Sequence, residues 1–512
     1  MNILIIGNLY LTDALKKKNT VVTAGIDNNY DIVVDSFFCD VFEDIIKKLP
    51  GAFYPDVIIL FEGPQQIFPQ RLEELDIPLA WHAMDSHVNY EWHKDYAVLF
   101  DYIFVCEKDY IPILSSKSNA KVLFTPLTCD PDINRPLFLP KKYDMVFVGS
   151  VHDDYYGRKE YLSFFQKHFN LKLFSNYFAA DMNKIFNEAK IVLNHPIKND
   201  LNFRVFEAMA SGSMLLTSRI NNGMDDFFVS GTDYISFDSK KLEEGVDKAV
   251  FYLAHDRERE RIALSGCQKV RKAHTRLIRA EQIVEFIMEN PVKKNISDNL
   301  YKSLGNAYFI LEQLVFSLNK TRRYAGEAWH SSSFVLQKHI EMYPNDPEGY
   351  YLLGMCMIAR EDFVMARSLF CKCLEVDHSY FRADIGLGAL ALNENRIEDA
   401  LLHIGKALND NYSEAKAVLE KTYLALVDLF AGFFTLGGIF FNLGFVSESI
   451  VYFERALDLD AQHNDLLKYL GVAYFKEGRE EEALTCFKRV LTFDSKDKMA
   501  KQFIFRISCG AG

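Results

Sequence analysis

The N-terminal half of the chain alternates short apolar runs with amphipathic segments. Up to about residue 135, strands are predicted for the runs NILIIG, DIVVDSF, DVIILFEG, PLAWHAMD, YIFVCE and KVLFTP, and helices for Val41–Leu49 and Pro69–Leu75. Strands alternating with helices indicate a parallel sheet of βαβ units, and near-continuous apolar runs are typical of a sheet covered on both faces. Residues 1–135 are therefore expected to form a Rossmann-like lobe.

The pattern restarts after the proline-rich segment Cys129–Lys142, which reads as a linker because proline breaks helices and strand ladders. Strands are predicted for YDMVFVGS, LKLFS, IVLNHP, SMLLTS and YISF, and helices for FAADMNKIFNEAK and FRVFEAMASG. A helix around Arg271–Met288 is expected to close the unit. Residues 136–292 thus form a second Rossmann-like lobe, in which ligands would bind beyond the carboxyl ends of the strands.

Strand patterns vanish after about residue 300, and a helical repeat replaces them. Glycines recur at a fixed period, and each is followed by a small residue and then by a large apolar one: Gly354, Ala366, Phe370; Gly388, Ala400, Ile404; Gly437, Ser449, Phe453; Gly471, Ala483, Phe487. A period of about 34 residues with this ladder is the signature of tetratricopeptide repeats, whose small residues let paired helices approach closely.

The predicted fold class is therefore α/β followed by all-α: two Rossmann-like lobes and an α-solenoid over residues 300–512. The step from Gly388 to Gly437 exceeds one period by less than half a repeat, so an insertion or a degenerate repeat is expected near Tyr412–Leu429. An atypical helix pair at about 301–343 is expected to cap the array.

Composition narrows the function classes. The chain has 512 residues with a net charge of -12, which argues against nucleic-acid binding because phosphate backbones need a basic face. The first residues lack the pattern of a signal peptide, and the apolar run Leu429–Phe441 is too short for a membrane span. Nine scattered cysteines favour free thiols in a reducing, cytoplasmic compartment over a disulfide framework or metal site.

The segment Asn202–Gly212 carries the sharpest candidate chemistry. A helix is expected to begin near Asn202, where free N–H groups suit a diphosphate, and to end at the glycine. Arg204 and Glu207 lie one helical turn apart and share a helix face. The guanidinium can neutralise phosphate, and the carboxylate can accept both hydroxyls of a ribose. An ordinary surface helix with an Arg–Glu pair is the competing interpretation.

The same stretch resembles the nucleotide-sugar motif R-x-x-E-A-x-A-x-G of the glycosyltransferase group 1 superfamily, especially its spore-maturation-protein-like branch. The segment YDMVFVGS with Arg158 resembles the opening of that family's second lobe, and His274 and Thr275 occupy the "H-T" position of its closing helices. The resemblance covers about residues 130–290 well and 1–130 loosely. It implies a two-lobed GT-B enzyme that uses a nucleotide-sugar donor and no separate cofactor.

Six residues of the second lobe are candidate donor-binding groups: Gly149, Ser150, Arg158, Asn194, Arg204 and Glu207. The resemblance implies that Glu207 holds the ribose, that Arg204 and Arg158 hold the phosphates, and that the glycine and serine let the first strand-loop approach the donor. The superfamily often places another Glu ahead of the ribose Glu, at the position where this chain has Asn199. This departure leaves the donor sugar open.

In the first lobe, the run Trp81–His87 follows a predicted strand, and Trp92 and His93 lie beyond it. Asp85 or His87 is the candidate general base for an acceptor hydroxyl. The competing interpretation is that the aromatic and histidine side chains pack the lobe interface. Asp153 and Asp154 form a poor metal motif, and GT-B sites commonly use helix dipoles and basic residues instead, so we predict no metal.

Three functions compete: a glycosyltransferase whose repeats recruit a protein acceptor, one acting on surface polysaccharide or lipid-linked glycan, and a non-catalytic scaffold. The retained Gly149, Arg158, Arg204 and Glu207 argue against the scaffold. A repeat groove often holds an extended peptide. The expected groove positions are Glu348, Tyr351, Met355, Arg382, Asn393, Asn442, Asp465, Lys468 and Lys476. Asn393 and Asn442 share one register and could clamp a peptide backbone, whereas repeats that only make homo-oligomers are the alternative.

Overall fold

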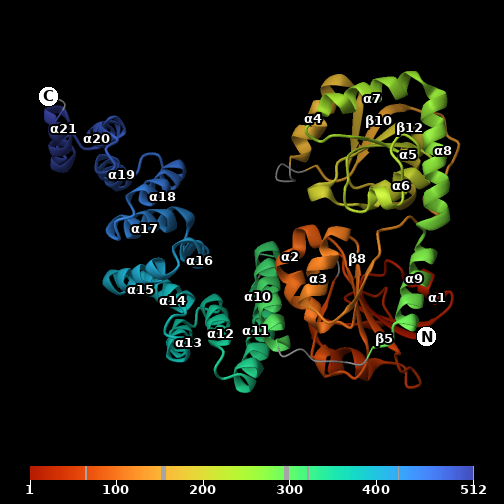
Figure 1. Ribbon diagram of the computed structural model, residues 1–512, viewed down its shortest axis with the longest axis horizontal. Coiled ribbons are helices and arrows are strands. Elements are labelled where there is room, and N and C mark those ends of the chain that lie inside the picture. Colours follow the sequence, from red (N-terminus) through yellow and green to blue (C-terminus); the bar gives the residue numbers. More distant parts are fainter. Residues whose placement is uncertain (64–65, 152–156, 293–298, 320–321, 425, 511–512) are drawn as a thin grey trace. The chain divides into compact units, whose positions relative to one another are not determined.

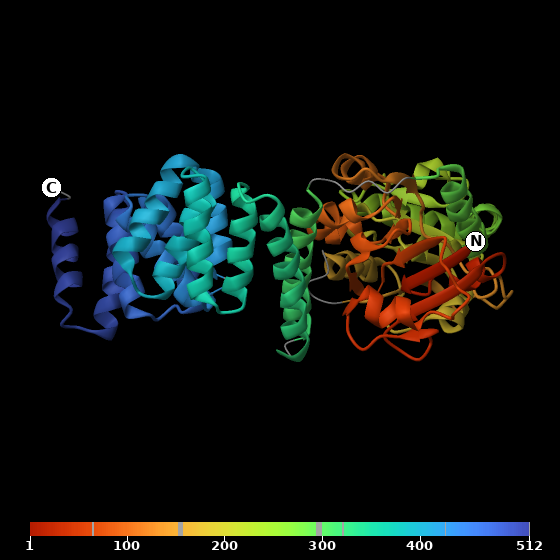
Figure 2. The ribbon, with the colours of Figure 1, turned by 90° about the horizontal axis from the view of Figure 1, so that it is seen from below.

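A computed structural model describes residues 1–63, 66–151, 157–292, 299–319, 322–424 and 426–510. The chain divides into two compact units, Met1–Ser331 and Ser332–Gly512. The first unit holds the parallel sheets and the second is all-helical (Figures 1 and 2). The predicted fold class, α/β followed by an all-α repeat array, is confirmed.

The first lobe is built on a seven-stranded parallel sheet with the order β3-β2-β1-β5-β7-β8-β9. The bounds of its strands are β1 Asn2–Gly7, β2 Thr20–Gly25, β3 Ile32–Val33, β5 Val57–Phe61, β7 Leu79–Ala83, β8 Tyr102–Val105 and β9 Lys121–Phe124. Helices α1 (Thr12–Lys16), α2 (Ser86–Tyr96) and α3 (Ile111–Lys117) belong to the same lobe. Ile3, Leu4 and Ile5 in β1 have no exposed surface, as expected for a strand covered on both faces.

One predicted helix of this lobe, Pro69–Leu75, is wrong, and the other, Val41–Leu49, is helical but not α-helical. Phe68–Gln70 is a short strand, β6, paired with β4 (Phe38–Asp40), and only Leu72–Glu74 after it forms a 3-10 turn. Val41–Leu49 is a π turn over Val41–Ile45 followed by a 3-10 turn over Ile46–Lys48. Both segments are short, so neighbouring backbone decides their conformation over local propensity.

The second lobe has a five-stranded parallel sheet with the order β11-β10-β12-β13-β14. The bounds of its strands are β10 Tyr143–Val148, β11 Leu171–Phe174, β12 Ala189–Asn194, β13 Met214–Ser218 and β14 Ile235–Phe237. Its helices are α4 Arg158–His168, α5 Ala179–Glu188, α6 Phe203–Ala210, α7 Leu242–Ala254 and α8 Asp256–Ala273. Each strand predicted from an apolar run is present, because alternating strands and helices leave a strong local pattern.

The single helix expected around Arg271–Met288 is instead two helices. α8 ends at Ala273, and α9 (Arg276–Glu289) begins after Thr275, whose hydroxyl caps it by accepting a hydrogen bond from the N–H of Ile278 at 3.4 Å. The break is paired with the linker, because the N–H of Cys129 bonds the carbonyl of His274 at 3.0 Å. The chain then returns to the first lobe, where α9 packs on α1.

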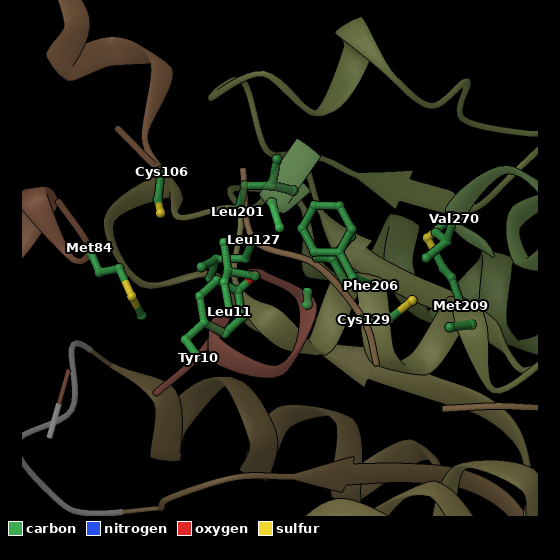
Figure 3. Packing of buried hydrophobic residues seen from close by; sticks show 14 of the residues in the cluster. Tyr10, Leu11, Met84, Cys106, Leu127, Cys129, Leu201, Phe206, Met209 and Val270 are labelled. Atoms are coloured by element: carbon green, nitrogen blue, oxygen red, sulfur yellow. The ribbon is translucent and has the colours of Figure 1, made fainter. Parts of the chain in front are cut away.

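One apolar core continues from the first lobe into the second. Tyr10, Leu11 and Met84 of the first lobe belong to the same buried cluster as Leu201 and Phe206 of the second (Figure 3). Where the two lobes pack together, the rings of Tyr10 and Phe203 meet edge to face, with their centres 5.3 Å apart. This contact places the start of α6 against the first lobe.

Helix α10 (Leu300–Asn319) belongs to the first unit, although the sequence places it at the start of the repeat domain. It packs on α2: Asn306 donates a hydrogen bond to the carboxylate of Asp95 at 2.6 Å. The hydroxyl of Tyr308 also donates to the carbonyl of Pro69 at 3.4 Å, and its ring lies 6.2 Å from that of Tyr96. Helix α11 (Arg322–Met342) then leads to the second unit.

The second unit is a run of helix pairs. Its helices are α12 Pro347–Ala359, α13 Phe363–Val376, α14 Phe381–Asn393, α15 Ile397–Asp410, α16 Tyr412–Leu424, α17 Leu429–Asn442, α18 Val446–Leu459, α19 Asn464–Lys476, α20 Glu480–Phe493 and α21 Lys498–Gly510. The extra stretch predicted between Gly388 and Gly437 forms one additional helix, α16, which packs on α14 and α15. No helix in the described ranges is both long and apolar enough to cross a bilayer.

The signature glycines mark where the two helices of a pair touch. A Cβ added to Gly354, Gly437 or Gly471 would lie 2.5, 2.4 or 2.9 Å from the ring of the phenylalanine that completes the same ladder. Those phenylalanine rings are fully buried. The small residue is therefore required by packing, since a dense core has no room for another methyl group.

Two adjacent glycines of α17 test this packing. Gly437→Ala should lower the free energy of unfolding by about 1–3 kcal/mol, because its methyl group would collide with the buried ring of Phe453. Gly438→Ala is the matched control: its Cβ would meet no atom within 4 Å, so it should be neutral or stabilise the helix by up to about 1 kcal/mol. Urea denaturation of the full chain measures both, and equal effects would contradict the packing argument.

Candidate active site

Two arginines lie on one aromatic ring at the carboxyl ends of β10 and β12. The guanidinium carbon of Arg204 is 4.3 Å from the centre of the Phe147 ring, and that of Arg158 is 5.5 Å from it. Arg204 is held by the carbonyl of Val148 at 2.6 Å and by the side-chain oxygen of Asn194 at 2.7 Å. Arg158 donates to the carbonyl of Ser150 at 3.0 Å.

The other predicted donor-site residues support this pair. Asn194 is fully buried, and its amide also donates to the hydroxyl of Thr217 at 3.1 Å, which fixes the oxygen that receives Arg204. Gly149 leaves the space that Arg204 fills, because a Cβ there would lie 2.2 Å from its Nη2 atom. The Ser150 side chain is exposed, and its carbonyl is the part that contacts Arg158.

The electrostatics of the pair favour an anion. Burial, followed by repulsion from Arg158, lowers the pKa of Arg204 to about 10. Neither carbonyl nor amide oxygens offset a full positive charge, and no ion pair joins Arg204 to a carboxylate of the described residues. Burial and the two guanidinium charges also lower the pKa of the neighbouring His195 to about 4, so this imidazole is neutral at pH 7. A bound phosphate would stabilise both guanidinium groups.

Glu207 lies one turn after Arg204 in α6, as predicted. Burial raises the pKa of its carboxyl to about 7, while the charges of Arg204 and Arg276 act in the opposite direction. In the described part of the chain, its carboxylate makes no hydrogen bond, so it can accept hydroxyl groups from a ligand. The helix around it ends at Gly212, whose φ of 78° is the left-handed conformation expected of a glycine cap.

A cavity of about 1180 Å³ lies next to the arginine pair in the second lobe. The rings of Tyr161, Phe164 and His195 contribute to its wall, so it offers flat surfaces for a base. Its charged lining is mainly basic: Lys159, Lys167 and Arg219, against Glu160. The cavity begins at the N-terminal end of α4 and is of a size that takes a small-molecule ligand.

Asn199 lines the same cavity. Its backbone conformation explains why asparagine stands at the position where the superfamily often has glutamate. Its φ is 71°, in the left-handed region, where asparagine is tolerated better than glutamate. Its side-chain oxygen accepts a hydrogen bond from the N–H of Asn221 at 2.8 Å. Its amide donates to Asp109 of the first lobe at 3.4 Å. The residue therefore joins three loops around the site.

In the first lobe, Asp85 and His87 lie together at the carboxyl end of β7. Asp85 is exposed and adopts a φ of 56°, while His87 is buried. The Nδ1 atom of His87 lies 3.3 Å from Oε1 of Glu107, which also accepts the N–H of Asp85 at 3.1 Å. Lys198 of the second lobe reaches the carbonyl of His87 at 3.4 Å. The pair thus faces the loop that precedes α6.

The aromatic residues around this pair belong to the core. Trp81 is fully buried, and its ring lies 4.6 Å from His93 and 5.3 Å from Phe100. Trp92 and His93 are buried in the same group. These side chains therefore pack, as the competing interpretation expected, but inside the first lobe and not at the lobe interface. The role of Asp85 or His87 as general base stays a prediction. Asp153 and Asp154 lie outside the described residues.

Sequence reasoning missed Glu62, Glu107 and Phe147. Glu62 directly follows β5, and Glu107 follows β8 after Cys106. The runs DVIILFEG and YIFVCE contain the signal, which is an acid at the end of an apolar run. Phe147 is hidden inside an ordinary apolar strand, so its contact with two arginines leaves no mark in the sequence.

Residues 139–285, which include the arginine pair and Glu207, match the family model described as "Glycosyl transferase-like". The second lobe is a glycosyl transferase-like domain. Residues 470–497 match the model described as "Tetratricopeptide repeat". The two Rossmann-like lobes have the arrangement called GT-B, and the resemblance inferred from the motif is confirmed.

Two curated relatives from Schizosaccharomyces pombe match part of the chain. "Superkiller protein 3" is 26% identical over 191 residues, which are 37% of this chain and 13% of the relative. "Anaphase-promoting complex subunit 3" is 20% identical over 178 residues, 34% of this chain and 24% of the relative. The chain thus spans at most a quarter of the length of either relative.

Among solved structures, sucrose-phosphate synthase from Thermosynechococcus elongatus matches 56% of this chain and 98% of its own, with 11% identity and a TM-score of 0.40. HepE from Anabaena, in complex with UDP and glucose, matches 57% of this chain and all of its own, with 11% identity and a TM-score of 0.42. YrrB, described as a tetratricopeptide-repeat protein with an unusual peptide-binding site, matches 43% of this chain and 95% of its own, with 17% identity and a TM-score of 0.22.

The predicted groove of the repeats is partly occupied by the protein's own contacts. Tyr351 is buried against the rings of Phe370 and Tyr380, so it does not line a groove. Arg382 pairs with Glu414 of α16 and lies 3.9 Å from Glu348. Charged side chains in this part therefore bond one another.

The two asparagines that share one register are exposed. Asn393 is exposed at the end of α14, and Asn442 is exposed at the end of α17. The amide of Asn442 donates to the carbonyl of Gly438 at 2.9 Å, which leaves its oxygen at the surface. Lys476 is exposed as well, and its ammonium lies 4.1 Å from the ring of Phe441.

Glu207 of the glycosyl transferase-like domain predicts a pH dependence of nucleotide binding. Only the ionised carboxylate accepts two hydroxyls, and the raised pKa of about 7 means that it protonates as pH falls through 7. The affinity for a nucleoside diphosphate should therefore rise between pH 6 and pH 8, measured by isothermal titration calorimetry. Glu207→Gln should bind about tenfold more weakly at pH 8. The pH profile of Glu207→Gln serves as the control, because it contains the ionisation of the phosphates but not that of the carboxylate. An identical pH profile in the parent and in Glu207→Gln would exclude this role for Glu207.

Proposed function

We propose that this protein transfers a sugar from a nucleotide-sugar donor to an acceptor, and that the acceptor is a protein recruited by the tetratricopeptide repeats. The observation that carries the donor assignment is the pair of guanidinium groups on Phe147, with the carboxylate of Glu207 one helical turn away. Positive charge suits the diphosphate, and the carboxylate suits the ribose. The match of residues 139–285 to the "Glycosyl transferase-like" model supports the same assignment.

The first lobe supplies the groups that act on the acceptor. Asp85 and His87 are the proposed residues that activate its hydroxyl. They stand close to the loop that leads into α6, because Lys198 bonds the backbone of His87. No metal or further cofactor is required for donor binding in this proposal.

Substitutions in the two lobes should have separable effects. Arg204→Ala should weaken UDP binding at least tenfold, because it removes charge-assisted hydrogen bonds to the diphosphate. Asp85→Asn and His87→Ala should bind UDP as the parent does and lose about 10²–10⁴-fold in transfer rate. Calorimetry with UDP and a release assay on a panel of nucleotide sugars measure these effects. UDP and GDP binding that survive both Arg204→Ala and Glu207→Ala would refute the donor assignment.

The repeats support a protein acceptor over an anionic glycan. The expected groove positions are mixed in charge, with Glu348, Arg382, Asp465 and Lys468 among them, so no single-sign field attracts a polyanion. The exposed Asn393 and Asn442 offer both donors and acceptors, which suits a peptide backbone. None of the nine cysteines, all of which lie in the described ranges, is in a disulfide, which supports transfer in a reducing compartment, as in the cytoplasm.

Removal of the second unit tests recruitment. A chain that ends at Ser331 keeps α10 on the first lobe and should hydrolyse the donor at the parent's rate. It should transfer sugar to the native acceptor protein at less than about a tenth of that rate, because the local concentration of the acceptor is lost. Mass spectrometry of the acceptor measures transfer. Full-rate modification of that protein by the truncated chain would show that the repeats do not recruit the acceptor, which would favour their use in assembly.

A further inference from the structure

Three acidic residues follow three neighbouring strands of the first sheet. Glu62 follows β5, Asp85 follows β7 and Glu107 follows β8, and these strands are adjacent in the order β5-β7-β8. Because all of them are parallel, their carboxyl ends lie at one edge of the sheet. Glu62 and Glu107 are each 4% exposed, so this edge holds buried negative charge.

The two buried glutamates fix the turn that carries Asp85. Glu62 accepts the N–H of Met84 at 2.8 Å, and Glu107 accepts the N–H groups of Asp85 and Ser86 at 3.1 and 3.3 Å. Three consecutive N–H groups are thus bonded by two carboxylates. This explains how a non-glycine residue is held at a φ of 56°, a conformation that costs about 1 kcal/mol or more.

The turn brings one imidazole and two carboxylates together. One potential ligand atom from each of Asp85, His87 and Glu107 lies within 4.8 Å of the other two. The distance of 3.3 Å from Nδ1 of His87 to Glu107 is long for a charge-assisted hydrogen bond. Two ligand atoms that each lie about 2.0–2.1 Å from one tetrahedral ion are about 3.3 Å from each other, so this distance fits two ligands of one ion.

The charges around His87 favour a cation. The carboxylates of Glu107, Asp200 and Asp85 all act on its imidazole, and Oε1 of Glu107 lies 3.3 Å from its Nδ1 atom. Asp200 comes from the second lobe, on the loop before α6, and is buried. Three carboxylates from three segments therefore surround a single imidazole, and a divalent ion would offset their excess negative charge.

We propose that Asp85, His87 and Glu107 bind a divalent transition-metal ion, such as Mn²⁺ or Zn²⁺. An imidazole with two carboxylates is a nitrogen and oxygen ligand set that these ions accept. Asp85 is exposed, so one side of the ion would be open to water or to an oxygen of the substrate. The binding itself depends only on the first lobe; a part in transfer, at the acceptor hydroxyl, rests on the proposed function.

This site differs from the sequence-based expectation of no metal. Asp85 and His87 are visible in the sequence, but Glu107 lies well beyond them in the chain and reaches them through the next strand. When the ligands follow two different strands, their separation along the sequence is not fixed, unlike in the short Cys/His motifs of structural zinc sites.

Metal binding is tested on the full chain without donor or acceptor. Protein treated with EDTA and dialysed should bind one equivalent of Mn²⁺ or Zn²⁺ in calorimetric titrations. Asp85→Asn should weaken that binding at least tenfold, and its fold should be preserved because asparagine also tolerates the left-handed conformation. His87→Ala and Glu107→Gln should weaken it as much.

Asp144→Asn is the matched control, since Asp144 is an exposed carboxylate of the second lobe that pairs with Lys190. It should bind the ion like the parent. Loss of affinity in Asp85→Asn with an unchanged melting temperature identifies the ligand. Failure of both ions to bind stoichiometrically, or equal affinity in all four variants, would overturn the metal site. Neither result bears on UDP binding at Arg204, so the two proposals fail independently.

Discussion

Charged side chains removed from water need compensation, and this requirement shapes both lobes. Arg204 donates hydrogen bonds to a backbone carbonyl and an asparagine amide oxygen and lies on the ring of Phe147, contacts that hold the side chain but leave its charge for a bound anion. Glu107 is compensated by backbone N–H groups. All these groups lie at the carboxyl ends of parallel strands, where the sheet stops supplying hydrogen bonds. Backbone groups at these strand ends therefore hold both Arg204 and Glu107 in place.

The parts of the molecule that sequence predicts well are those that follow from local periodicity. The ladder of a glycine, a small residue and a large apolar residue marks four helix pairs, because the contact of Gly437 with Phe453 has counterparts at Gly354, Gly388 and Gly471. Strands β12, β13 and β14 of the second lobe are buried along nearly their whole length and leave apolar runs. Arg204 and Glu207 were predicted as a pair because one helical turn places them on one face.

The remaining features depend on contacts between distant segments. Glu107 meets His87 because adjacent strands bring their ends together, and neither local propensity nor spacing records that pairing. Pro69 lies in a strand because a second short strand stands beside it, although its neighbours favour a helix. The chain breaks at Thr275 because the linker pairs with it there. In each case a tertiary contact outweighs the local signal.

The local contacts of the second unit affect when it can fold during synthesis. Its helices pack mainly on helices one or two places away in the chain, as α12 does on α13 and α14, and α17 on α18 and α19. Each pair can therefore complete its contacts soon after it leaves the ribosome, without waiting for a distant segment. The first lobe, in contrast, takes α9 and α10 back from beyond the second lobe, so its packing must wait until the chain has been synthesised as far as Asn319.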